Sequence, residues 1–479
     1  MSGSGRPKSG ITVGIDIGTT SVKALAVDDE GQVLARARVP HGVVSPFAGA
    51  FEHDVDLAWR ANVITALDEV STGLDVAAVN VSAMVPSLAA VDSGGRALSP
   101  GLLYGDVRGR TVDNVASEPG DAGEVLAFLR WLTERSPGAA GYWPAQAVAN
   151  HALTGIGAID GATASTAHPL HDYRRWDEEQ ATSAGATVDQ LPKVVGGVRP
   201  VGRVLDGLPA AGALVGAGTI DALGEQVVAG ADSTGDVLVI LGATLIVWSV
   251  IPEWTTVAGL WTVPHTAPGM IVIGGPSTAG GMFVDAVDRW AAPATAEQIA
   301  AVDPADLPVW LPYVRGERCP LHRPELRAEV HDVTLHHGPA EIRAAALEAT
   351  GFVVRHLLDL AVSAGSSPRR VVATGGGTRS TPWMQALADT TGLPVDVVAV
   401  PEGAALGAAF GARCVADLET SDAPFGPNIT DARRWARTAA RFDPDPVREL
   451  QATDRYHRFR ALTGQLGSDP NCPPRTVGV

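Results

Sequence analysis

One acidic residue of the sequence lies in a setting that suits a catalytic base. Asp221 lies within the glycine-rich stretch 216–224 (GAGTIDALG), which follows the apolar residues 213–215. An Asp in such a place caps a helix roughly twice as often as it does chemistry. As a base, its carboxylate would take a proton from a hydroxyl group within hydrogen-bond reach. The stretch by itself leaves both roles open for Asp221.

Two other stretches are suited to holding phosphate groups. Residues 14–23 (GIDIGTTSVK) combine glycines, which let the backbone approach a phosphate, with hydroxyl groups and Lys23. An ordinary hairpin would explain this stretch equally well if it stood alone. Residues 371–380 (VVATGGGTRS) predict a strand that enters a glycine-rich turn before a helix at 381–391. Such a helix start can bind the ribose, adenine or phosphate of a nucleotide.

The common nucleotide-binding signatures are absent from the sequence. It holds no GxxxxGK sequence followed by Ser or Thr, and no GxGxxG sequence after a strand. A nucleotide would therefore have to be held by the two stretches described above. Asp16, in the first of them, has the oxygen ligands that hydrated Mg²⁺ prefers.

The elements that must position these residues are strands alternating with helices. Short β-branched runs predict the strands, and apolar residues at intervals of three and four predict the helices. This alternation indicates an α/β protein. The hairpin around residues 18–21 recurs around residues 242–244, which suggests that each half of the chain begins with the same unit. The predicted strands are 11–17, 22–27, 32–39, 237–241 and 245–250, and the predicted helices are 57–70, 123–133 and 340–362.

Length, charge and cysteine content limit the partners and the location. A chain of 479 residues fits two domains with a cleft between them, and the small polar residues 230–235 are the expected boundary. The net charge of −17 opposes a nucleic acid or an anionic membrane as partner. Three distant cysteines and a polar leader without an apolar run indicate a cytoplasmic protein. The arginine-rich residues 433–460 are interpreted as a solvated helical tail.

The order of the motifs resembles that of the FGGY carbohydrate kinases. This family belongs to the actin-like ATPase superfamily and includes xylulokinases, glycerol kinases and ribulokinases. The resemblance covers about residues 11–460. It rests on seven segments in family order, which are GIDIGTT at 14–20, YGDVR at 104–108, LTG at 153–155, Asp221, LPY at 311–313 with GER at 316–318, TGGG at 374–377 and EGAALGAA at 402–409.

The resemblance implies two actin-like ATPase (ribonuclease H-like) α/β domains with an active-site cleft between them. An N-terminal domain at 11–230 would bind the sugar and phosphate, and a C-terminal domain at 231–460 would bind the nucleotide. Residues 1–10 and 461–479 would be flexible tails. Members of the family are often dimers, so the resemblance points to a homodimer.

For the active site, the resemblance implies transfer of the terminal phosphoryl group of ATP to a sugar hydroxyl, with Asp221 as the base. Asp16 would orient Mg²⁺ through water. Gly280 and Gly281 match a glycine pair that approaches the nucleotide in relatives, although close helix packing explains such glycines equally well. The implied ATP contacts are Thr19, Thr20, Lys23, Thr244, Gly281, Gly376 and Gly377.

The sugar contacts are where the sequence departs from the best-known members. Asp106 and Arg108 match the Asp-x-Arg motif of the family. Xylulokinases usually carry Met-His where this chain has Val85 and Pro86, and Asn where it has Ala222. These departures predict a more apolar or differently shaped pocket. A ketopentose such as xylulose is the first choice of substrate, with ribulose, a hexulose, glycerol or erythritol behind it.

Two acidic segments of the resemblance are left outside the predicted site. Residues 52–54 (EHD) lie where family members often carry Glu-Gln-Asp near the sugar pocket, and a solvated turn explains them equally well. Glu317 and Arg318 are interpreted as an ion pair that holds a loop.

Two other functions stay open at this stage. An actin-like or chaperone-like ATPase has the same superfamily fold, but it needs no hydroxyl-binding surface such as Asp106 and Arg108. A catalytically inactive sugar or nucleotide sensor would explain the changes at Pro86 and Ala222. The retained Asp16 and Asp221 favour the kinase.

Overall fold

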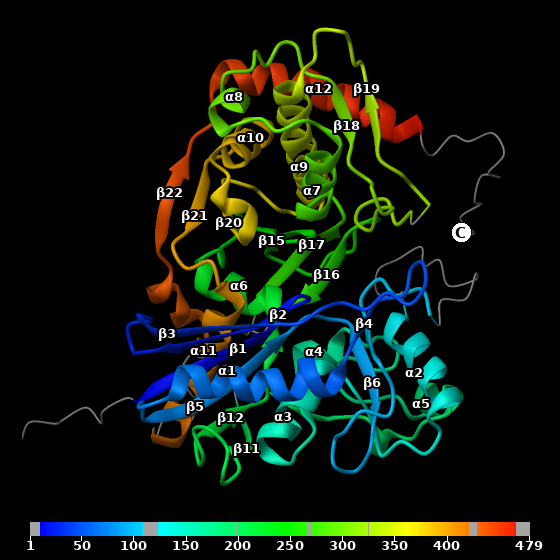
Figure 1. Ribbon diagram of the computed structural model, residues 1–479, viewed down its shortest axis with the longest axis vertical. Coiled ribbons are helices and arrows are strands. Elements are labelled where there is room, and N and C mark those ends of the chain that lie inside the picture. Colours follow the sequence, from blue (N-terminus) through cyan, green and yellow to red (C-terminus); the bar gives the residue numbers. More distant parts are fainter. Residues whose placement is uncertain are drawn as a thin grey trace, which may run out of the picture. The chain divides into compact units, whose positions relative to one another are not determined.

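The chain folds into two compact units. The computed structural model describes residues 10–108, 123–196, 199–265, 270–323, 325–420 and 429–465. Unit 1 comprises Met1–Asp232, Val263–Ile271 and Glu402–Arg437, and unit 2 comprises Ser233–Thr262, Val272–Pro401 and Thr438–Val479 (Figure 1). The first crossing of the chain between the units lies within the stretch 230–235.

Unit 1 is built on a mixed sheet in which the strand order is β11-β12-β5-β1-β2-β3. Strand β1 pairs antiparallel with β2 and parallel with β5, and the short strand β13 also pairs parallel with β5. The predicted hairpin at the start of the chain is therefore confirmed. The strands are β1 (Ile11–Ile17), β2 (Ser21–Val27), β3 (Val33–Pro40), β5 (Val76–Ala83), β11 (Pro200–Arg203), β12 (Leu214–Gly216) and β13 (Thr219–Ile220).

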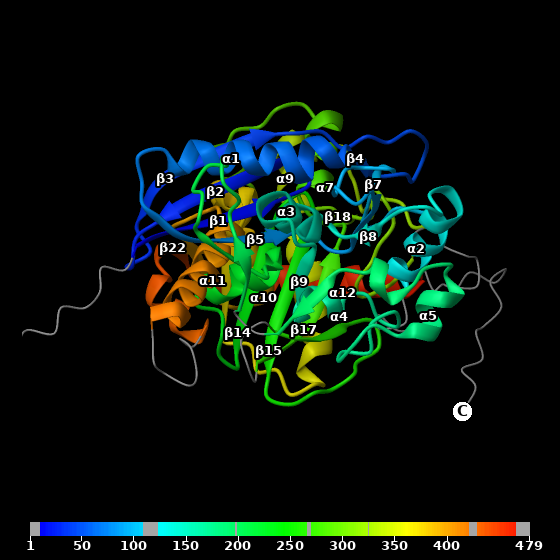
Figure 2. The same cartoon turned by 90° about the horizontal axis from the view of Figure 1, so that it is seen from below.

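The two faces of strand β1 have different neighbours because side chains alternate along a strand. Val13 and Ile15 belong to the same buried cluster as Val63 of α1 (Asn62–Ser71). Gly14 faces α11 (Gly403–Thr420), where a Cβ atom would lie 1.9 Å from the carbonyl oxygen of Ala405. Figure 2 shows α1 and α11 on opposite sides of β1 and β2. The glycine thus lets α11 lie directly on the strand that carries Asp16.

A smaller layer completes unit 1. Its sheet has the strand order β4-β7-β6-β8, and α2 (Glu124–Arg135) packs on β6 through buried residues such as Phe128 and Leu132. The remaining elements of unit 1 are β4 (Glu52–His53), a π-helical turn (Asp56–Ala61), β6 (Ser87–Val91), β7 (Gly101–Leu103), β8 (Gly141–Trp143), α3 (Ala145–Thr154), β9 (Ala158–Asp160), α4 (Gly161–Ser165), α5 (Glu178–Ser183), a 3₁₀ turn (Val188–Gln190), β10 (Lys193–Val195), α6 (Asp221–Ala229) and a 3₁₀ turn (Ile429–Trp435).

Unit 2 repeats the topology of the unit 1 sheet. Its strand order is β16-β17-β15-β14-β20-β21-β22, and β14 pairs antiparallel with β15 and parallel with β20 (Figure 1). The order β17-β15-β14-β20-β21 thus matches the order β3-β2-β1-β5-β12, as the recurring hairpin suggested. The strands are β14 (Asp236–Leu241), β15 (Leu245–Ile251), β16 (Trp261–Pro264), β17 (Ile271–Ser277), β18 (Val309–Leu311), β19 (Glu329–His331), β20 (Arg370–Thr374), β21 (Val395–Val398) and β22 (Thr438–Phe442).

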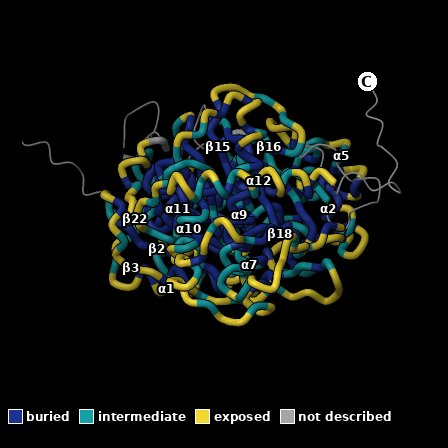
Figure 3. The backbone as a smooth tube through the Cα atoms, turned by 90° about the horizontal axis from the view of Figure 1, so that it is seen from above, coloured by how far each residue is buried: buried dark blue, intermediate teal, exposed yellow. Residues whose placement is uncertain are grey.

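The longest helix of the described residues, α9, lies in the core of unit 2. Residues on successive turns of α9 are buried, among them Ala349, Phe352 and Leu357 (Figure 3). A helix that is apolar around most of its circumference is a buried helix. The helices of unit 2 are α7 (Gly281–Trp290), α8 (Ala296–Ala300), α9 (Pro339–Val362), a 3₁₀ turn (Gly376–Arg379), α10 (Thr381–Thr391) and α12 (Pro446–Gln465).

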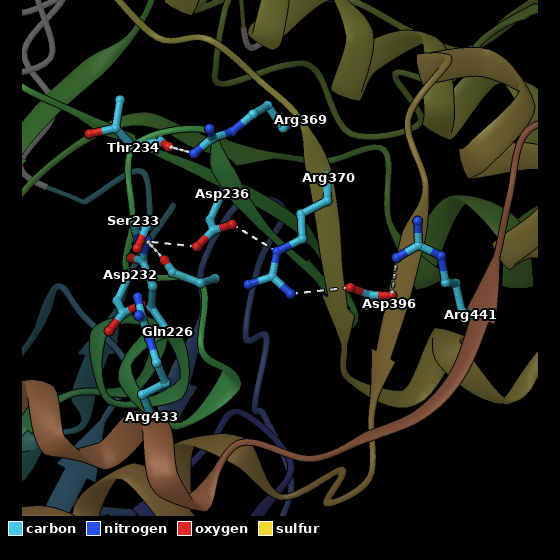
Figure 4. A network of polar contacts seen from close by, with 11 residues as sticks. Gln226, Asp232, Ser233, Thr234, Asp236, Arg369, Arg370, Asp396, Arg433 and Arg441 are labelled. Atoms are coloured by element: carbon cyan, nitrogen blue, oxygen red, sulfur yellow. Dashed lines mark hydrogen bonds and ion pairs between the residues drawn. The ribbon is translucent and has the colours of Figure 1, made fainter.

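An ion-pair network joins neighbouring strands where the parallel strands of unit 2 begin. The Nε atom of Arg370 donates to Asp236 at 2.7 Å, and its Nη1 atom donates to Asp396 at 3.1 Å. Arg441 of β22 donates to Asp396 at 3.3 Å (Figure 4). We call these four residues the ion-pair ladder. The glycine-rich turn after β20 lies at the other end of the same strands.

The interpretation of residues 433–460 as a solvated helical tail is wrong in part. Only α12 within this segment is α-helical, since β22 pairs with β21 as an edge strand. Trp435 is buried and donates through Nε1 to the carbonyl oxygen of Asp29 at 3.0 Å. Tyr456 and Phe459 are buried as well. Trp435, Tyr456 and Phe459 are therefore anchors in the core.

None of the helices within the described ranges is long and apolar enough to cross a bilayer.

Candidate active site

Adjacent strand ends of unit 1 bring Asp16 and Asp221 into one region. On parallel strands, Asp16 is the register partner of Ser82, and Thr219 pairs with the same Ser82 on its other side. Gln146 fixes this arrangement by donating to the carbonyl oxygens of Val81 and Thr219 at 3.2 and 3.0 Å. Asp221 follows β13 directly and starts α6. The predicted base and the predicted metal-orienting carboxylate thus lie at the ends of two strands, β13 and β1, that flank β5 on opposite sides.

Asp221 has the electrostatic environment of a proton acceptor. Burial raises its pKa to about 7, and the negative charge of Asp16 acts in the same direction. A hydrogen bond from the amide of Ala222, at 2.7 Å, and the charge of Lys23 oppose this rise in pKa. The N-cap residue of α6 is Ile220, so Asp221 occupies the first helical position. A carboxylate with a pKa near 7 exchanges protons near neutral pH.

Asp16 and Lys23 form an ion pair across the β1–β2 hairpin. Their Oδ2 and Nζ atoms lie 3.3 Å apart, and Asp16 is buried while Lys23 is partly exposed. The charge of Asp16 raises the pKa of Lys23 against the opposing effect of burial, and Glu225 adds to the rise. Ser82 donates to the second oxygen of Asp16 at 3.3 Å. Lys23 thus stays positively charged beside the turn.

The turn between β1 and β2 presents two threonines in different states. The amide of Gly18 donates to the carbonyl oxygen of Ser21 at 3.1 Å and closes the turn. The hydroxyl of Thr19 shares a hydrogen bond with the hydroxyl of Tyr104 at 2.9 Å. Thr20 is exposed, and its hydroxyl makes no hydrogen bond to any residue of the described ranges. Of the two, only the hydroxyl of Thr20 is open to a ligand without losing a contact.

Asp106 and Arg108 are joined in a buried cluster. Arg108 donates from its backbone and from Nε to one oxygen of Asp106, at 2.8 and 2.9 Å, and from Nη2 to the other. Glu52 accepts from Nη1 of Arg108. The amide of Phe51 also donates to Asp106, at 2.6 Å. The contacts of Asp106 with Arg108 and Phe51 position the guanidinium, and a contact of either residue with a sugar stays a prediction.

Val85 and Pro86 line a small apolar cavity in unit 1. The cavity has a volume of about 20 Å³, the size of one water molecule or methyl group. Apolar side chains dominate its walls, so these two positions offer no polar contact of their own. The other large side chains in its lining are Leu88, Val125, Tyr142, Ile159, Leu170, Trp176 and Leu191.

The turn of unit 2 is held by backbone atoms. The amides of Gly281 and Met282 donate to the carbonyl oxygens of Gly242 and Ala243 at 2.8 and 2.9 Å. A Cβ atom at position 280 would lie 2.3 Å from the carbonyl carbon of Thr244, and one at position 281 would lie 2.7 Å from the carbonyl oxygen of Gly242. Both glycines are therefore required for the packing of α7 on the turn, and a nucleotide contact at Gly281 stays a prediction.

The glycine-rich turn after β20 has one open position. Gly375 has a φ of 90°, which favours glycine. A Cβ atom at position 377 would lie 2.7 Å from the Cβ atom of Leu241 and 2.8 Å from the Trp383 ring. A Cβ atom at position 376 would meet no atom within 4 Å. Of the two glycines of this turn that are predicted to contact ATP, Gly376 and Gly377, only Gly376 leaves space for a ligand to approach.

A cavity of about 220 Å³ in unit 2 was not predicted from the sequence. It opens among α7, α8, α9 and the start of α10, and its walls combine apolar side chains with Asp288, Arg343 and Ser380. An apolar wall with a few polar groups is typical of small-molecule binding sites in general. The apolar side chains are Val284, Val287, Ala294, Ala296, Ile299, Ala346, Leu347 and Pro382.

Glu317 holds the segment around Ser277 and Thr278, and its contacts there were not predicted from the sequence. Its carboxylate accepts from the hydroxyl of Ser277 at 2.7 Å and from the amide of Thr278 at 3.0 Å. Burial raises its pKa to about 7. The guanidinium of Arg318 lies over the ring of Trp261, 5.2 Å from its centroid. Glu317 thereby fixes the segment that leads to Gly280.

Comparison with known sequences decides the family. A model described as the FGGY family of carbohydrate kinases, N-terminal domain, matches residues 11–229, and the model of the C-terminal domain matches residues 263–414. This chain belongs to the FGGY family of carbohydrate kinases. These matches, together with the similarity to known xylulose kinases, confirm that the protein is an ATP-dependent sugar kinase.

Several xylulose kinases are similar to this FGGY kinase over nearly their whole length. The xylulose kinase of Escherichia coli (strain K12) is 26% identical and covers 95% of this chain and 99% of its own. The xylulose kinase of Streptomyces coelicolor is 29% identical, and the match covers 95% of this chain and 96% of that relative. The crystal structure of xylulose kinase from Rhodospirillum rubrum has a TM-score of 0.80 at 27% identity, with 95% and 99% covered. The predicted fold, two α/β domains of the FGGY type, is thereby confirmed.

Several residues that support the predicted site of this FGGY kinase were not predicted from its sequence. His41, His53 and Tyr104 contact the β1–β2 turn. Glu52 belongs to the Arg108 cluster, and its place in the EHD segment was a signal for that role. The lining of the 220 Å³ cavity is spread over separate helices and gave no local signal.

Proposed function

We propose that this kinase transfers the γ-phosphoryl group of ATP to a hydroxyl of a small ketose, with xylulose as the first candidate. The observation that carries the catalytic assignment is the environment of Asp221, which follows β13, one strand beyond β5 from Asp16, and whose pKa burial and the charge of Asp16 raise to about 7. The choice of xylulose is supported by relatives of 24–29% identity that are named xylulose kinase.

In this proposal the residues of each unit have separate tasks. Asp221 accepts the proton of the sugar hydroxyl as the new bond to phosphorus forms. Lys23 and the hydroxyl of Thr20 bind phosphate oxygens in unit 1, and Thr244 does so in unit 2. The hydroxyl of Thr244 makes no hydrogen bond to a described residue, which leaves it free for a phosphate. Gly376 lets the nucleotide approach the backbone.

The residues present fit a magnesium ion that is held mainly by phosphate and water. Within the described ranges no group of three or more His, Cys, Asp and Glu side chains could hold a metal ion. Asp16 is a buried carboxylate whose negative charge contributes to the high pKa of Asp221, so a cation beside it would be favoured. Magnesium usually keeps several waters and binds through one or two carboxylates and the substrate phosphates. When bound, it would neutralise charge on the transferring group.

The identity of the sugar depends on positions where the chain differs from xylulokinases. Val85, Pro86 and Ala222 supply no polar side chain, so a ribulose, hexulose, glycerol or erythritol kinase is the alternative. A relative from Bacillus subtilis, 24% identical, is named gluconokinase. An anionic sugar is disfavoured here, because Glu52 and Asp106 already neutralise Arg108. A cytoplasmic location and a homodimer stay predictions.

The test is release of ADP with Mg-ATP and a panel of ketoses, aldoses and polyols, run beside Asp221→Asn. We expect strong turnover with one compound and a fall in kcat of about 10²- to 10⁴-fold in the variant. An unchanged kcat in Asp221→Asn would contradict the assignment of the base. ATP hydrolysis at the full rate without sugar would favour an ATPase, and nucleotide binding without turnover would favour a sensor.

A further inference from the structure

Three consecutive carbonyl oxygens of the β1–β2 turn accept hydrogen bonds from two histidines. The Nε2 atom of His41 lies 3.0 Å from the carbonyl oxygen of Gly18, and the Nε2 atom of His53 lies 2.9 Å from that of Thr19. The backbone amide of His41 donates to the carbonyl oxygen of Thr20 at 3.0 Å. A carbonyl only accepts, so both rings must carry their proton on Nε2.

The surroundings of His53 favour this protonation state. The indole Nε1 atom of Trp59 donates to Nδ1 of His53 at 3.0 Å, which excludes a proton on that nitrogen. Burial lowers the pKa of His53 to about 4, and the neighbouring His41 ring lies edge-on with its centroid 4.6 Å away. His53 ends β4, and Trp59 lies in the π-helical turn Asp56–Ala61. His53 is thus a neutral donor that points to Thr19.

The direction of each carbonyl fixes the direction of an amide. In a planar trans peptide the C=O and N–H groups point to opposite sides. The Gly18 carbonyl that faces His41 therefore turns the amide of Thr19 away from the histidines, and the Thr19 carbonyl does the same for the amide of Thr20. Neither amide donates to another residue of the described ranges. Successive free amides in a turn are the groups from which proteins build concave anion-binding sites.

We propose that His53 and His41 are positioning residues for phosphoryl transfer, which hold the carbonyl oxygens of residues 18–20 away from the phosphate and leave the amides of Thr19 and Thr20 free to bind it. This inference rests on the proposed function, because it assigns the turn to ATP. Without the histidine donors, these peptide units would be free to rotate and present an oxygen to the phosphate. The histidines themselves do not touch ATP.

Two substitutions of His53 separate the hydrogen bond from the volume of the ring. His53→Ala removes the donor, and we expect kcat/KM for Mg-ATP and the affinity for Mg-ADP to fall about tenfold, the effect of one neutral hydrogen bond. In His53→Gln the amide nitrogen can donate to Thr19 while its oxygen accepts from Trp59, so both quantities should stay within roughly threefold. His336→Ala, at an exposed histidine, is the control. Equal losses in the two His53 variants would overturn the proposal.

Trp59→Phe tests the proton on His53 while the histidine stays in place. We expect nitrogen NMR of the histidine rings to show the proton of His53 on Nε2 in the parent chain. In the variant, the neutral ring should be a mixture of the two tautomers, with the proton on either Nε2 or Nδ1. The affinity for Mg-ADP should fall in part. Observation of the proton on Nδ1 in the parent would overturn the proposal. A failure of the proposed function can be told apart from a failure of this inference. If the parent chain has no kinase activity, the difference in Mg-ADP affinity between the parent and the His53 variants still tests the role of His53.

Discussion

The hairpins that open the two units have the same pairing pattern and carry different chemistry. In unit 1 the second residue pair before the turn is Asp16 and Lys23, and in unit 2 the corresponding pair is Ile240 and Ile246. The parallel neighbour of Asp16 is Ser82, and the parallel neighbour of Ile240 is Thr374. The two hairpins therefore have the same pairing, and each has a hydroxyl residue, Ser82 or Thr374, at the matching position of the parallel strand. The charged pair is found in the hairpin of unit 1 alone.

The two turns are also held in place by different means. Side chains of His41, His53 and Tyr104 hold the turn of unit 1. The amides of Gly281 and Met282 hold the turn of unit 2. Side-chain support can be replaced by another side chain of similar chemistry, whereas backbone support without space for a Cβ atom cannot. We infer that the hairpin of unit 1, with Asp16 and Lys23, serves the metal and phosphate chemistry, and that the turn of unit 2 gives the nucleotide a close, uncharged surface.

Among the changes that test this comparison of the two hairpins, the largest effect should follow from removal of the charge that distinguishes them. Asp16→Asn keeps the shape and an oxygen near Ser82, but it removes the carboxylate that would orient the metal. We expect kcat to fall about 100-fold, the upper range for loss of an outer ligand of a metal. The matched change in unit 2, Ile240→Val, should leave kcat nearly unchanged. Similar losses of kcat in both variants would break the comparison.

The dependence of activity on pH should come next in size. Because Asp221 acts as a base, it must be deprotonated, and its pKa in the free protein is raised to about 7. We therefore expect kcat/KM for ATP to fall about tenfold for each pH unit below 7 and to level off above it. In Asp16→Asn the neighbouring negative charge is lost, so the fall should begin at a lower pH. A profile that is flat from pH 5 to 8 would contradict the role of Asp221.

Two neighbouring glycines of unit 2 should separate nucleotide contact from packing. Gly377→Ala places its Cβ atom against Leu241 and Trp383, so we expect a loss of stability of about 1–3 kcal/mol and a lower thermal unfolding midpoint. Gly376→Ala meets no atom of the described residues, and it should change stability by less than about 0.5 kcal/mol. It should nevertheless raise the KM for ATP. An unchanged KM in Gly376→Ala would remove this glycine from the proposed site.

The sequence predicted the frame of the molecule better than the supports of its site. The two hairpins and helices α9 and α10 came from local patterns, because alternation and helical spacing are visible in consecutive residues. The place of Asp221 was predicted from a glycine-rich stretch and a family resemblance. Its raised pKa depends on burial and on Asp16, about 200 residues away in the sequence, so no local pattern reveals it.

The supporting contacts could not be predicted, because each joins segments that are distant in the sequence. His53 and Thr19 are separated by 34 residues, and Thr19 and Tyr104 by 85. The packing role of Gly280 was weighed from the sequence, but the atoms that it meets follow only from the position of the unit 2 turn. The edge strand β22 was missed because its burial pattern shows little of the alternation that marks a half-buried strand.

The smallest effect should come from the ion-pair ladder at the other end of the unit 2 strands. Asp396→Asn weakens contacts with Arg370 and Arg441, whose side chains are 34% and 52% exposed, so water screens much of the interaction. We expect a loss of stability of about 1 kcal/mol or less, seen as a lower thermal unfolding midpoint, with kcat unchanged. Asp443→Asn, at an exposed partner of Arg441, is the control and should leave both quantities unchanged. The ladder lies where the strands of unit 2 begin, and the glycine-rich turn lies where β20 ends. A fall in kcat in Asp396→Asn would therefore mean that the strands transmit changes along their length.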